Sequence, residues 1–399
     1  MVSIMKYSAI FAICLFSLHT TLSVADTTTA KPTATTNPVA TATTAKPLAD
    51  ADKLLAQLVD GGIRPLYREL DGSANTLMQR SQTFCSTPNA DNFKILRQGW
   101  GETLLAWQRT DALLFGPALE NQIDFQINFN PPRKIIINQL LNAKTRLDVA
   151  AVEAAGVGGQ GLGTLEFLLF DRDQTDAQLL EQFQGDAGKR RCAYVQAASE
   201  LLRKNIQIIA DQWLKDDNNT YATQFRNAYK GNATFASAQQ AVDLLVGKLY
   251  QSAEKAAKNR IGNPLGKGID LNTEGKQEVL NTSNAYQLEN WRSGYAIKSV
   301  RANMDGMMRI LRDGGVLEWL RTHNNTQLEA VVADATESRL HKYLLLPEPS
   351  TDPFELIKSG KTKELDGYYY LGNDIQMGIK RQLAKVLGTQ LGFNDNDGD

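Results

Sequence analysis

The sequence predicts an all-α protein built from two helical bundles. Apolar residues recur every three or four positions along most of the chain, which is the spacing that lines one face of a helix. Alternation with a period of two, typical of strands, is scarce. Stretches rich in glycine and proline separate the periodic segments, and one of them, Gly231–Ala233, lies near mid-chain. We therefore expect a first bundle over residues 48–230, a second over residues 231–391 and an acidic tail over residues 392–399.

The first 47 residues lack the pattern of a folded core. A weakly basic start, an apolar stretch over residues 7–18 and a pair of small residues after it predict a secretory signal peptide over residues 1–25, and hence a periplasmic protein. The apolar stretch is shorter than the ~20 residues that a spanning helix needs. A lipid anchor at Cys14, which would attach the chain to a membrane, is the alternative. Residues 26–47 are nearly all Thr, Ala and Pro, which predicts a flexible spacer.

Several segments of the first bundle have helical character. Trp100–Arg109 places its two tryptophans on one helix face and Glu102 and Arg109 on another, because the members of each pair are seven residues apart. Helices are also expected at Ile135–Ile137, after two prolines, and at Thr145–Ala155. The longest apolar stripe consists of Val195, Ala198, Leu202, Ile206, Ile209 and Trp213.

The second bundle shows three apolar stripes and two breaks. The breaks are the glycine- and proline-rich stretch Ile261–Gly268 and the segment Pro347–Pro353. Each stripe must be buried against other helices. The stripes are Val242, Leu245, Leu249 and Ala253; Ile297, Val300, Met304, Met308 and Leu311; and Ile375, Ile379, Leu383, Leu387 and Leu391.

Composition and motifs exclude several classes of function. With 43 basic and 44 acidic residues the net charge is −1, so the chain lacks the basic surface of a nucleic-acid-binding protein. Three cysteines and three histidines exclude zinc ribbons and multi-histidine metal cages. Gly156, Gly158 and Gly161 have the spacing of a dinucleotide-binding loop, but a helix rather than a strand is expected before them. Nucleotide binding is therefore not expected.

Two cysteines lie outside the predicted signal peptide, Cys85 and Cys192. In an oxidising compartment they allow one intramolecular disulfide, closing a loop of about 100 residues. Two buried free thiols are the alternative, and the sequence does not choose between them.

The segment Gly161–Phe170 contains an acid inside an almost wholly apolar helix, Glu166. A helix that is apolar on all sides is buried, and a buried carboxylate is costly unless it is paired, protonated or bound to a cation. Glu166 is therefore either a metal ligand or acid–base group, or one half of a structural ion pair with an arginine.

Two other segments supply candidate partners for Glu166. Glu289, Arg292 and Ser293 stand at positions i, i+3 and i+4, which brings them together on a helix. The tryptophan-rich helix supplies Trp107 and Arg109. A packed tryptophan stripe with solvated charges is the alternative interpretation of such segments.

In this order, the segments resemble the imelysin-like family of exported bacterial proteins, which are also labelled peptidases. The tryptophan-rich helix leads to Leu114–Glu120, a glycine loop leads into Gly161–Phe170, and a later helix carries Glu289–Ser293. The resemblance spans roughly residues 50–391. It implies a fold of two helical bundles with a site between them, and an association with bacterial iron uptake at the cell envelope.

The family signature is Gly-x-His-x-x-Glu, of which this chain keeps Gly161 and Glu166 but has Gly163 in the histidine position. Gly163 supplies no imidazole, whereas Glu166 is a hard oxygen donor suited to ferric iron or another hard cation. The candidate binding site that results is Trp107, Arg109, Gly161, Glu166, Glu289, Arg292 and Ser293.

The expected function is non-enzymatic binding of iron, of an iron-chelate carrier or of an envelope uptake partner. Glu166 would contribute negative charge at an interdomain pocket. Arg109 and Arg292 would position an anionic chelator or balance the acid, and Trp107 would form a wall. A peptidase is one alternative, although the chain shows no His-Glu-x-x-His and no base beside a serine or cysteine nucleophile. An envelope interaction protein without metal is the other.

Overall fold

The computed structural model describes residues 48–267, 269–271, 277–279, 282–323 and 327–391. The predicted signal peptide, spacer and acidic tail lie outside these residues, as does Cys14. All described residues belong to one compact unit. The division near residue 230 stays a prediction. Within the described residues, no helix is both long and apolar enough to cross a membrane.

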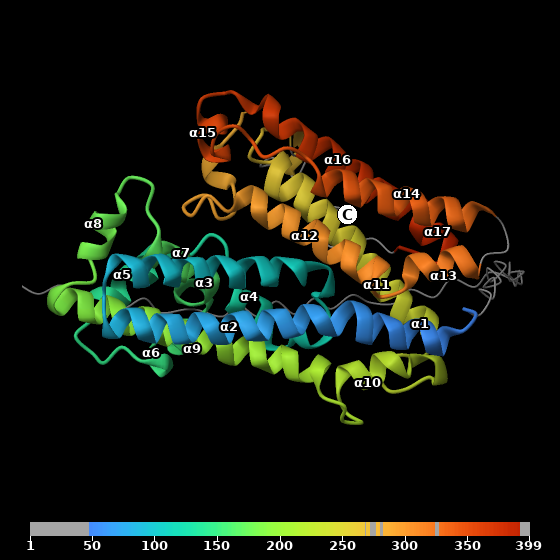
Figure 1. Ribbon diagram of the computed structural model, residues 1–399, viewed down its shortest axis with the longest axis horizontal. Helices are drawn as coiled ribbons and strands as arrows, with labels where there is room; N and C mark the ends of the chain where they lie inside the picture. The colour runs from blue at the N-terminus through green and yellow to red at the C-terminus, as the bar shows by residue number, and fades with distance from the viewer. Residues whose placement is uncertain (1–47, 268, 272–276, 280–281, 324–326, 392–399) are drawn as a thin grey trace, which may run out of the picture. The chain divides into compact units, whose positions relative to one another are not determined.

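The all-α prediction is confirmed. Helices before residue 230 form a first set, in which the long helix α2 (Arg64–Ser86) runs alongside α3 (Ala90–Arg109) and α9 (Gly185–Leu214), as Figure 1 shows. The shorter helices of this set are α1 (Ala51–Gln57), α4 (Ile123–Ile127), α5 (Lys134–Asn142), α6 (Val149–Ala154), α7 (Gly161–Leu169), α8 (Asp176–Glu181) and α10 (Tyr221–Arg226).

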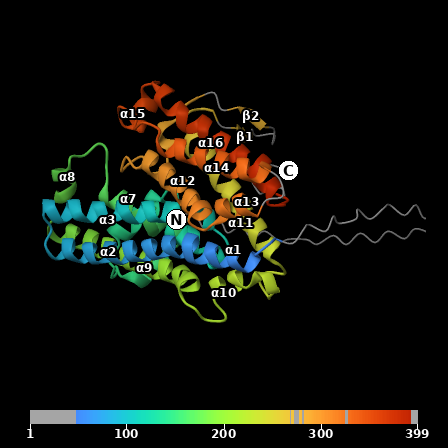
Figure 2. The same cartoon turned by 45° about the vertical axis from the view of Figure 1, so that its right-hand side comes forward.

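The second set of helices packs on the first through α12 (Ala296–Arg312), which contacts α3 on one side and α14 (Gln327–Leu344) on the other (Figure 2). The α3–α12 contact is close, because a Cβ built on Gly306 would lie 2.0 Å from the carbonyl oxygen of Arg109. A short antiparallel hairpin pairs β1 (Ile269–Leu271) with β2 (Gln277–Val279). The other helices of the set are α11 (Ala238–Glu254), α13 (Val316–Thr322), α15 (Pro353–Lys358), α16 (Asp366–Gly378) and α17 (Ala384–Val386).

The apolar stripes read from the sequence form the expected helices, with changes at some ends. The last one runs through α16, a π-helical turn and α17 and ends at Val386, before a left-handed Gly388 (φ 69°), so Leu391 lies beyond it. The helix expected over Thr145–Ala155 begins only after Asp148, whose side chain accepts the N–H of Ala151 and caps α6.

The helix predicted over Glu289–Ser293 is wrong. These residues form turns between a 3₁₀ turn at Ala285–Gln287 and the start of α12. Asn290 and Gly294 both adopt left-handed backbone conformations, with φ of 58° and 74°, which an α-helix does not admit. The i, i+3, i+4 spacing therefore does not describe how this segment presents its side chains.

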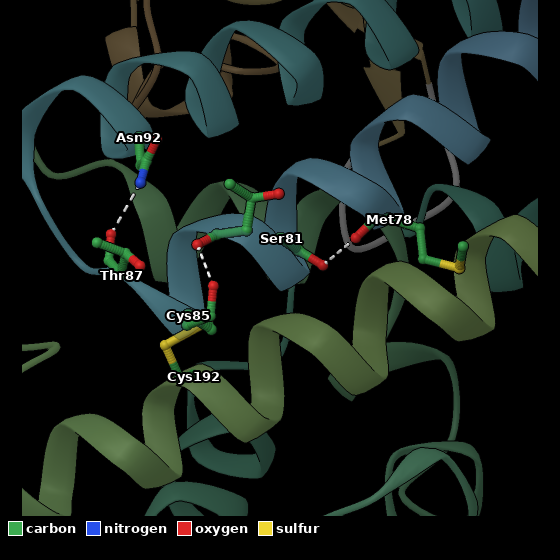
Figure 3. Close-up of a disulfide and its surroundings, with 8 residues drawn as sticks. Met78, Ser81, Cys85, Thr87, Asn92 and Cys192 are labelled. Carbon is green, nitrogen blue, oxygen red and sulfur yellow. Dashed lines mark hydrogen bonds between the residues drawn. A yellow bond between two sulfur atoms is a disulfide. The ribbon is translucent and has the colours of Figure 1, made fainter.

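A disulfide joins Cys85 near the end of α2 to Cys192 in α9, with their Cα atoms 5.5 Å apart (Figure 3). The residues are 107 positions apart in the chain. Of the two alternatives that the sequence leaves open, the structure has the bridge. It links two long helices of the first set, and on the chain-entropy model closing a loop of this length stabilises the folded protein by roughly 5 kcal/mol.

A buried network of charges connects the two sets of helices. Arg260, in the π-helical turn after α11, is 3% exposed and donates to Asp111 of the first set at 2.9 Å and to Glu289 at 2.8 Å. Asp111 also accepts from Ser252 at 2.9 Å and pairs with Lys255 at 3.3 Å. Burial by itself raises the pKa of Asp111, but the positive charges of Arg260 and Lys255 outweigh it and hold the pKa well below its usual range.

Replacing Arg260 by Met should lower the free energy of unfolding by ~3–5 kcal/mol at neutral pH, because it leaves Asp111 and Glu289 without their main partner. The lowered pKa of Asp111 means that its contribution is present above the ordinary value of 3.8 and is lost as the pH falls through the folded-state pKa. The difference between wild type and variant should therefore narrow in acid. Urea unfolding at several pH values measures this.

The matched control is Arg312→Met, because Arg312 pairs with Asp313 at the surface, where their side chains are 52% and 40% exposed. This change should alter stability by ~1 kcal/mol or less. Equal effects of the two substitutions would contradict a central role for Arg260.

Candidate functional site

Glu166 lies in α7 and is only 3% exposed, as the apolar helix predicts. Its Oε1 accepts two hydrogen bonds from Ser293, one from the backbone N–H at 3.0 Å and one from the hydroxyl at 2.8 Å. The structure therefore brings together Glu166 and Ser293, two residues of the predicted site. Among the described residues, no lysine or arginine nitrogen comes within 4.0 Å of Glu166, so it is held by hydrogen bonds and not by an ion pair.

Burial raises the pKa of Glu166 above its ordinary value of 4.5. The two hydrogen bonds from Ser293 and the positive charge of Arg292 oppose this effect without cancelling it, and the charge of Glu289 adds to it. The site thus favours the protonated acid more than water does. Oε2 has no hydrogen-bond partner in the described part of the chain, and it is the atom of Glu166 available to a ligand.

Glu166 lines a cavity of about 520 Å³. The lining combines two carboxylates, two cations, several side-chain amides and three aromatic rings, so the cavity offers a ligand both hydrogen bonds and ring contacts. The lining residues are Asn130, Pro131, Pro132, Lys134, Glu166, Phe167, Asn259, Asn263, Tyr286, Gln287, Leu288, Glu289, Asn290, Trp291 and Arg292.

The glycines at the start of α7 pack directly on the backbone at the end of α4 and in the loop that follows it. A Cβ built on Gly161, which has a φ of 75°, would lie 2.5 Å from the carbonyl oxygen of Ile127. A Cβ on Gly163 would lie 2.7 Å from the carbonyl oxygen of Phe129. Gly161, a residue of the predicted site, does not line the cavity. The histidine position is closed by backbone, so a side chain there would have to displace the loop.

The residues present do not fit a metal ion held by protein ligands alone. In the described ranges, no group of three or more His, Cys, Asp and Glu side chains could hold a metal ion. Glu166 alone supplies a single carboxylate, whereas protein metal sites of this kind use three or more ligands. Among the described residues, no neighbouring side chain completes a metal-ligand set in place of the signature histidine.

Arg292 lies on the wall of the cavity between two aromatic rings. The centre of its guanidinium is 4.4 Å from the ring centroid of Trp291 and 4.9 Å from that of Phe167. Glu289, on the same turn segment, is bound to Arg260 at 2.8 Å. The segment predicted to supply partners for Glu166 does so, although it is a turn and not a helix.

Trp107 and Arg109 are not brought to this cavity. Trp107 is buried within α3 at 5% exposure. Arg109 pairs with Glu69 of α2 and Asp305 of α12, both at 2.7 Å, and clamps three helices together. Their predicted roles as pocket wall and anion-positioning group are therefore wrong for this cavity, and the packed-stripe interpretation applies to them.

Sequence reasoning missed several polar residues of the lining, above all Asn130, Asn259, Asn263 and Tyr286. Asn259 and Asn263 are four residues apart, at the end of the π-helical turn, whereas Asn130 and Tyr286 come from two other segments. Only the adjoining prolines Pro131 and Pro264 mark two of these segments as irregular, and that signal carries no information on chemistry.

Residues 63–344 match the imelysin family, also designated peptidase M75. The chain belongs to the imelysin family. It is 24% identical over 208 residues to iron-regulated protein A of Synechococcus elongatus, a match that covers 52% of this chain and 53% of that relative. The chain thus matches about half the length of this curated relative.

Two solved structures share the imelysin fold with this chain, and each comparison covers 86% of this chain and 97% of the other. One is an imelysin-like protein from Psychrobacter arcticum, with a TM-score of 0.65 and 22% identity. The other is a putative iron-regulated protein A precursor from Parabacteroides distasonis, with a TM-score of 0.65 and 16% identity. At these identities the likeness concerns the fold.

Replacing Gly163 by Ala should lower the free energy of unfolding by ~1–3 kcal/mol, because the added methyl group meets the Phe129 carbonyl and overpacks the loop. The control is Gly72→Ala in α2, where a Cβ meets nothing within 4 Å. This second change should raise stability by up to ~1 kcal/mol, the helix-propensity gain. Thermal unfolding compares the two, and a stabilised Gly163→Ala variant would show that the loop yields freely.

Replacing Glu166 by Gln should leave the protein at least as stable as wild type at pH 7. Because burial raises the pKa of Glu166, the stability that the protonated acid contributes below pH 4.5 is lost as the pH rises through the folded-state pKa. Glutamine avoids this loss, and its amide oxygen can still accept from Ser293. The advantage should disappear near pH 4, which thermal unfolding from pH 4 to 8 measures; a variant less stable at pH 7 would mean that the carboxylate charge stabilises the fold.

Proposed function

We propose that this protein is an exported, non-enzymatic binding protein of the bacterial cell envelope, and that it binds an iron complex in the Glu166 cavity. The observation that carries the proposal is a buried carboxylate held by Ser293 in a cavity of about 520 Å³. Glu166 is fixed on one oxygen and available on the other, which suits it to contact a ligand without moving.

The size and chemistry of the cavity favour a chelated metal over a bare ion. A bare ferric ion needs several hard oxygen ligands from the protein, and the described residues offer no such cluster. A chelate brings its own ligands, so the protein needs only to recognise the outer surface of the complex. Amides, aromatic rings and the cations Lys134 and Arg292 are residue types that do this.

Iron enters the proposal through the relatives. The Synechococcus protein is named iron-regulated protein A, and the Parabacteroides structure is titled a putative precursor of a protein of that name. A regulated response to iron accords with a role in iron binding or uptake. The predicted signal peptide supports export, and the envelope is where an exported binding protein would meet an iron complex.

A peptidase is the alternative that the family designation suggests. Metal-dependent hydrolysis requires a ligand cluster, and the described residues contain none. Ser293 has Glu166 beside it, but its hydroxyl also lies 3.1 Å from the carbonyl oxygen of Asn290, and no histidine of the described residues is hydrogen-bonded to it as a base. A metal-free interaction protein is the other alternative, and binding measurements separate it from the proposal.

Calorimetric titration of the chain from residue 26 onward, with ferric citrate and separately with a ferric trishydroxamate, tests the proposal. We expect saturable binding of at least one complex by the wild type. Glu166→Ala should abolish that binding while remaining folded. Glu153→Ala is the matched control, because Glu153 lies in α6, is 53% exposed and does not line the cavity.

Absence of binding to either complex would overturn the proposal and favour an interaction protein. Hydrolysis of casein by the wild type, lost in Ser293→Ala, would favour the peptidase. Equal loss of binding in both glutamate variants would show that the complex binds elsewhere.

A further inference from the structure

A series of cationic and aromatic side chains in contact leads to the cavity, where three of its members, Phe167, Trp291 and Arg292, form part of the lining. The Arg172 guanidinium lies 4.7 Å from the ring centroid of Phe354, and this ring stacks on Trp291 at 5.1 Å and 18°. Arg292 follows on Trp291 at 4.4 Å and ends the series on Phe167 at 4.9 Å. The contacts join residues from three separate parts of the chain, and the two rings beside Arg292 limit the freedom of its guanidinium.

The two arginines of this series differ in their polar contacts. Arg172 donates to the carbonyl oxygen of Trp291 at 2.7 Å and pairs with Asp352 at 2.9 Å. For Arg292, no carboxylate of the described residues lies within 4.0 Å, and its guanidinium makes no hydrogen bond with them. The two rings cover part of the Arg292 guanidinium, whereas its N–H donors have no hydrogen-bond partner among the described residues and remain available to a ligand.

The two carboxylates that line the same cavity make their polar contacts with residues other than Arg292. Glu289 binds Arg260 at 2.8 Å, and Glu166 accepts both hydrogen bonds from Ser293 on one oxygen. Neither forms an ion pair with Arg292. The donor edge of Arg292 is thus a preformed feature of the cavity wall that the protein itself does not use.

A second polar side chain of the lining is also incompletely bonded. Asn290 is 2% exposed and donates to the Ser299 hydroxyl at 3.1 Å, but its Oδ1 is buried without a partner. The side-chain nitrogen Nδ2 of Asn130, which lines the same cavity, is also buried without a partner. Buried polar atoms without partners are rare and point to a missing ligand or water.

We infer that Arg292 recognises a carboxylate group of the ligand through two parallel N–H···O bonds. The planar fork of a guanidinium matches the two oxygens of a carboxylate, and its weak hydration makes it suited to do so next to aromatic rings. This inference rests on the proposed function and deepens it. It assigns the cavity to polycarboxylate complexes, such as a ferric hydroxycarboxylate, in preference to chelates that expose no carboxylate.

Calorimetric titration with metal-free citrate, ferric citrate, a ferric trishydroxamate and inorganic phosphate tests the inference. Arg292→Lys keeps the positive charge but loses the fork, and we expect its affinity for both citrate probes to fall by about tenfold or more, the effect of one charge-assisted hydrogen bond. The matched control is Arg97→Lys, because Arg97 also stacks between two rings, Phe93 at 5.3 Å and Phe170 at 4.4 Å, but does not line the cavity. Arg292→Gln serves as a second variant if the lysine variant unfolds.

The outcomes separate this inference from the proposed function. Unchanged citrate affinity in Arg292→Lys overturns the inference. Binding of the trishydroxamate complex that depends on Glu166 but not on Arg292 also overturns it, and leaves the proposed function standing. Equal, Arg292-dependent affinity for citrate with and without iron supports the inference and counts against iron selectivity. Phosphate binding as tight as citrate binding overturns carboxylate specificity, and failure of every probe overturns both proposals.

Discussion

The guanidinium of Arg260 binds Asp111 from the first set of helices and Glu289 from the turn that borders the cavity, at 2.9 and 2.8 Å. Both arginine and aspartate are almost fully buried, so each charge depends on the other to remain there. The pair therefore does more than join two sets of helices. Through the bond from Arg260 to Glu289, the network also anchors the segment from Glu289 to Ser293, which supplies both the hydrogen bonds to Glu166 and the side chain of Arg292. The site is thus tied to the buried charges that join the two sets of helices.

The departure from the family signature has a structural counterpart. Where the signature has histidine, this chain has Gly163, and the carbonyl oxygen of Phe129 lies 2.7 Å from the position of the missing Cβ. The same loop continues through Asn130 and its two prolines into the wall of the cavity. The loop can lie this close to α7 because position 163 has no side chain. Glu166 is present in α7 as in the signature, but the cavity that it lines contains side-chain amides and aromatic rings and, among the described residues, no imidazole.

The proposed function assigns a metal complex and not a bare ion to the cavity, and the groups that line it are the reason. Glu166 is bound on one oxygen by Ser293 and its protonated form is favoured by burial, which weakens it as the sole ligand of a cation. Arg292 adds positive charge to the wall, which opposes a bare cation and favours an anion. Recognition then depends on hydrogen bonds and stacking to the outside of a ligand, for which a few fixed polar groups among aromatic rings are suited.

The helical stripes, the buried position of Glu166 and the family were all predictable from the sequence, because a period of 3.6 residues and an apolar surrounding are local properties of the chain. The sequence also left the right alternatives open for Cys85 and Cys192. Only the tertiary structure decided that Glu166 is hydrogen-bonded to Ser293 and that Arg292 contacts the rings of Trp291 and Phe167. It also decided that Arg109 forms ion pairs between helices and does not line the cavity. These outcomes depend on left-handed residues in a turn and on loops from distant parts of the chain, whose positions are set by packing and not by spacing along the sequence.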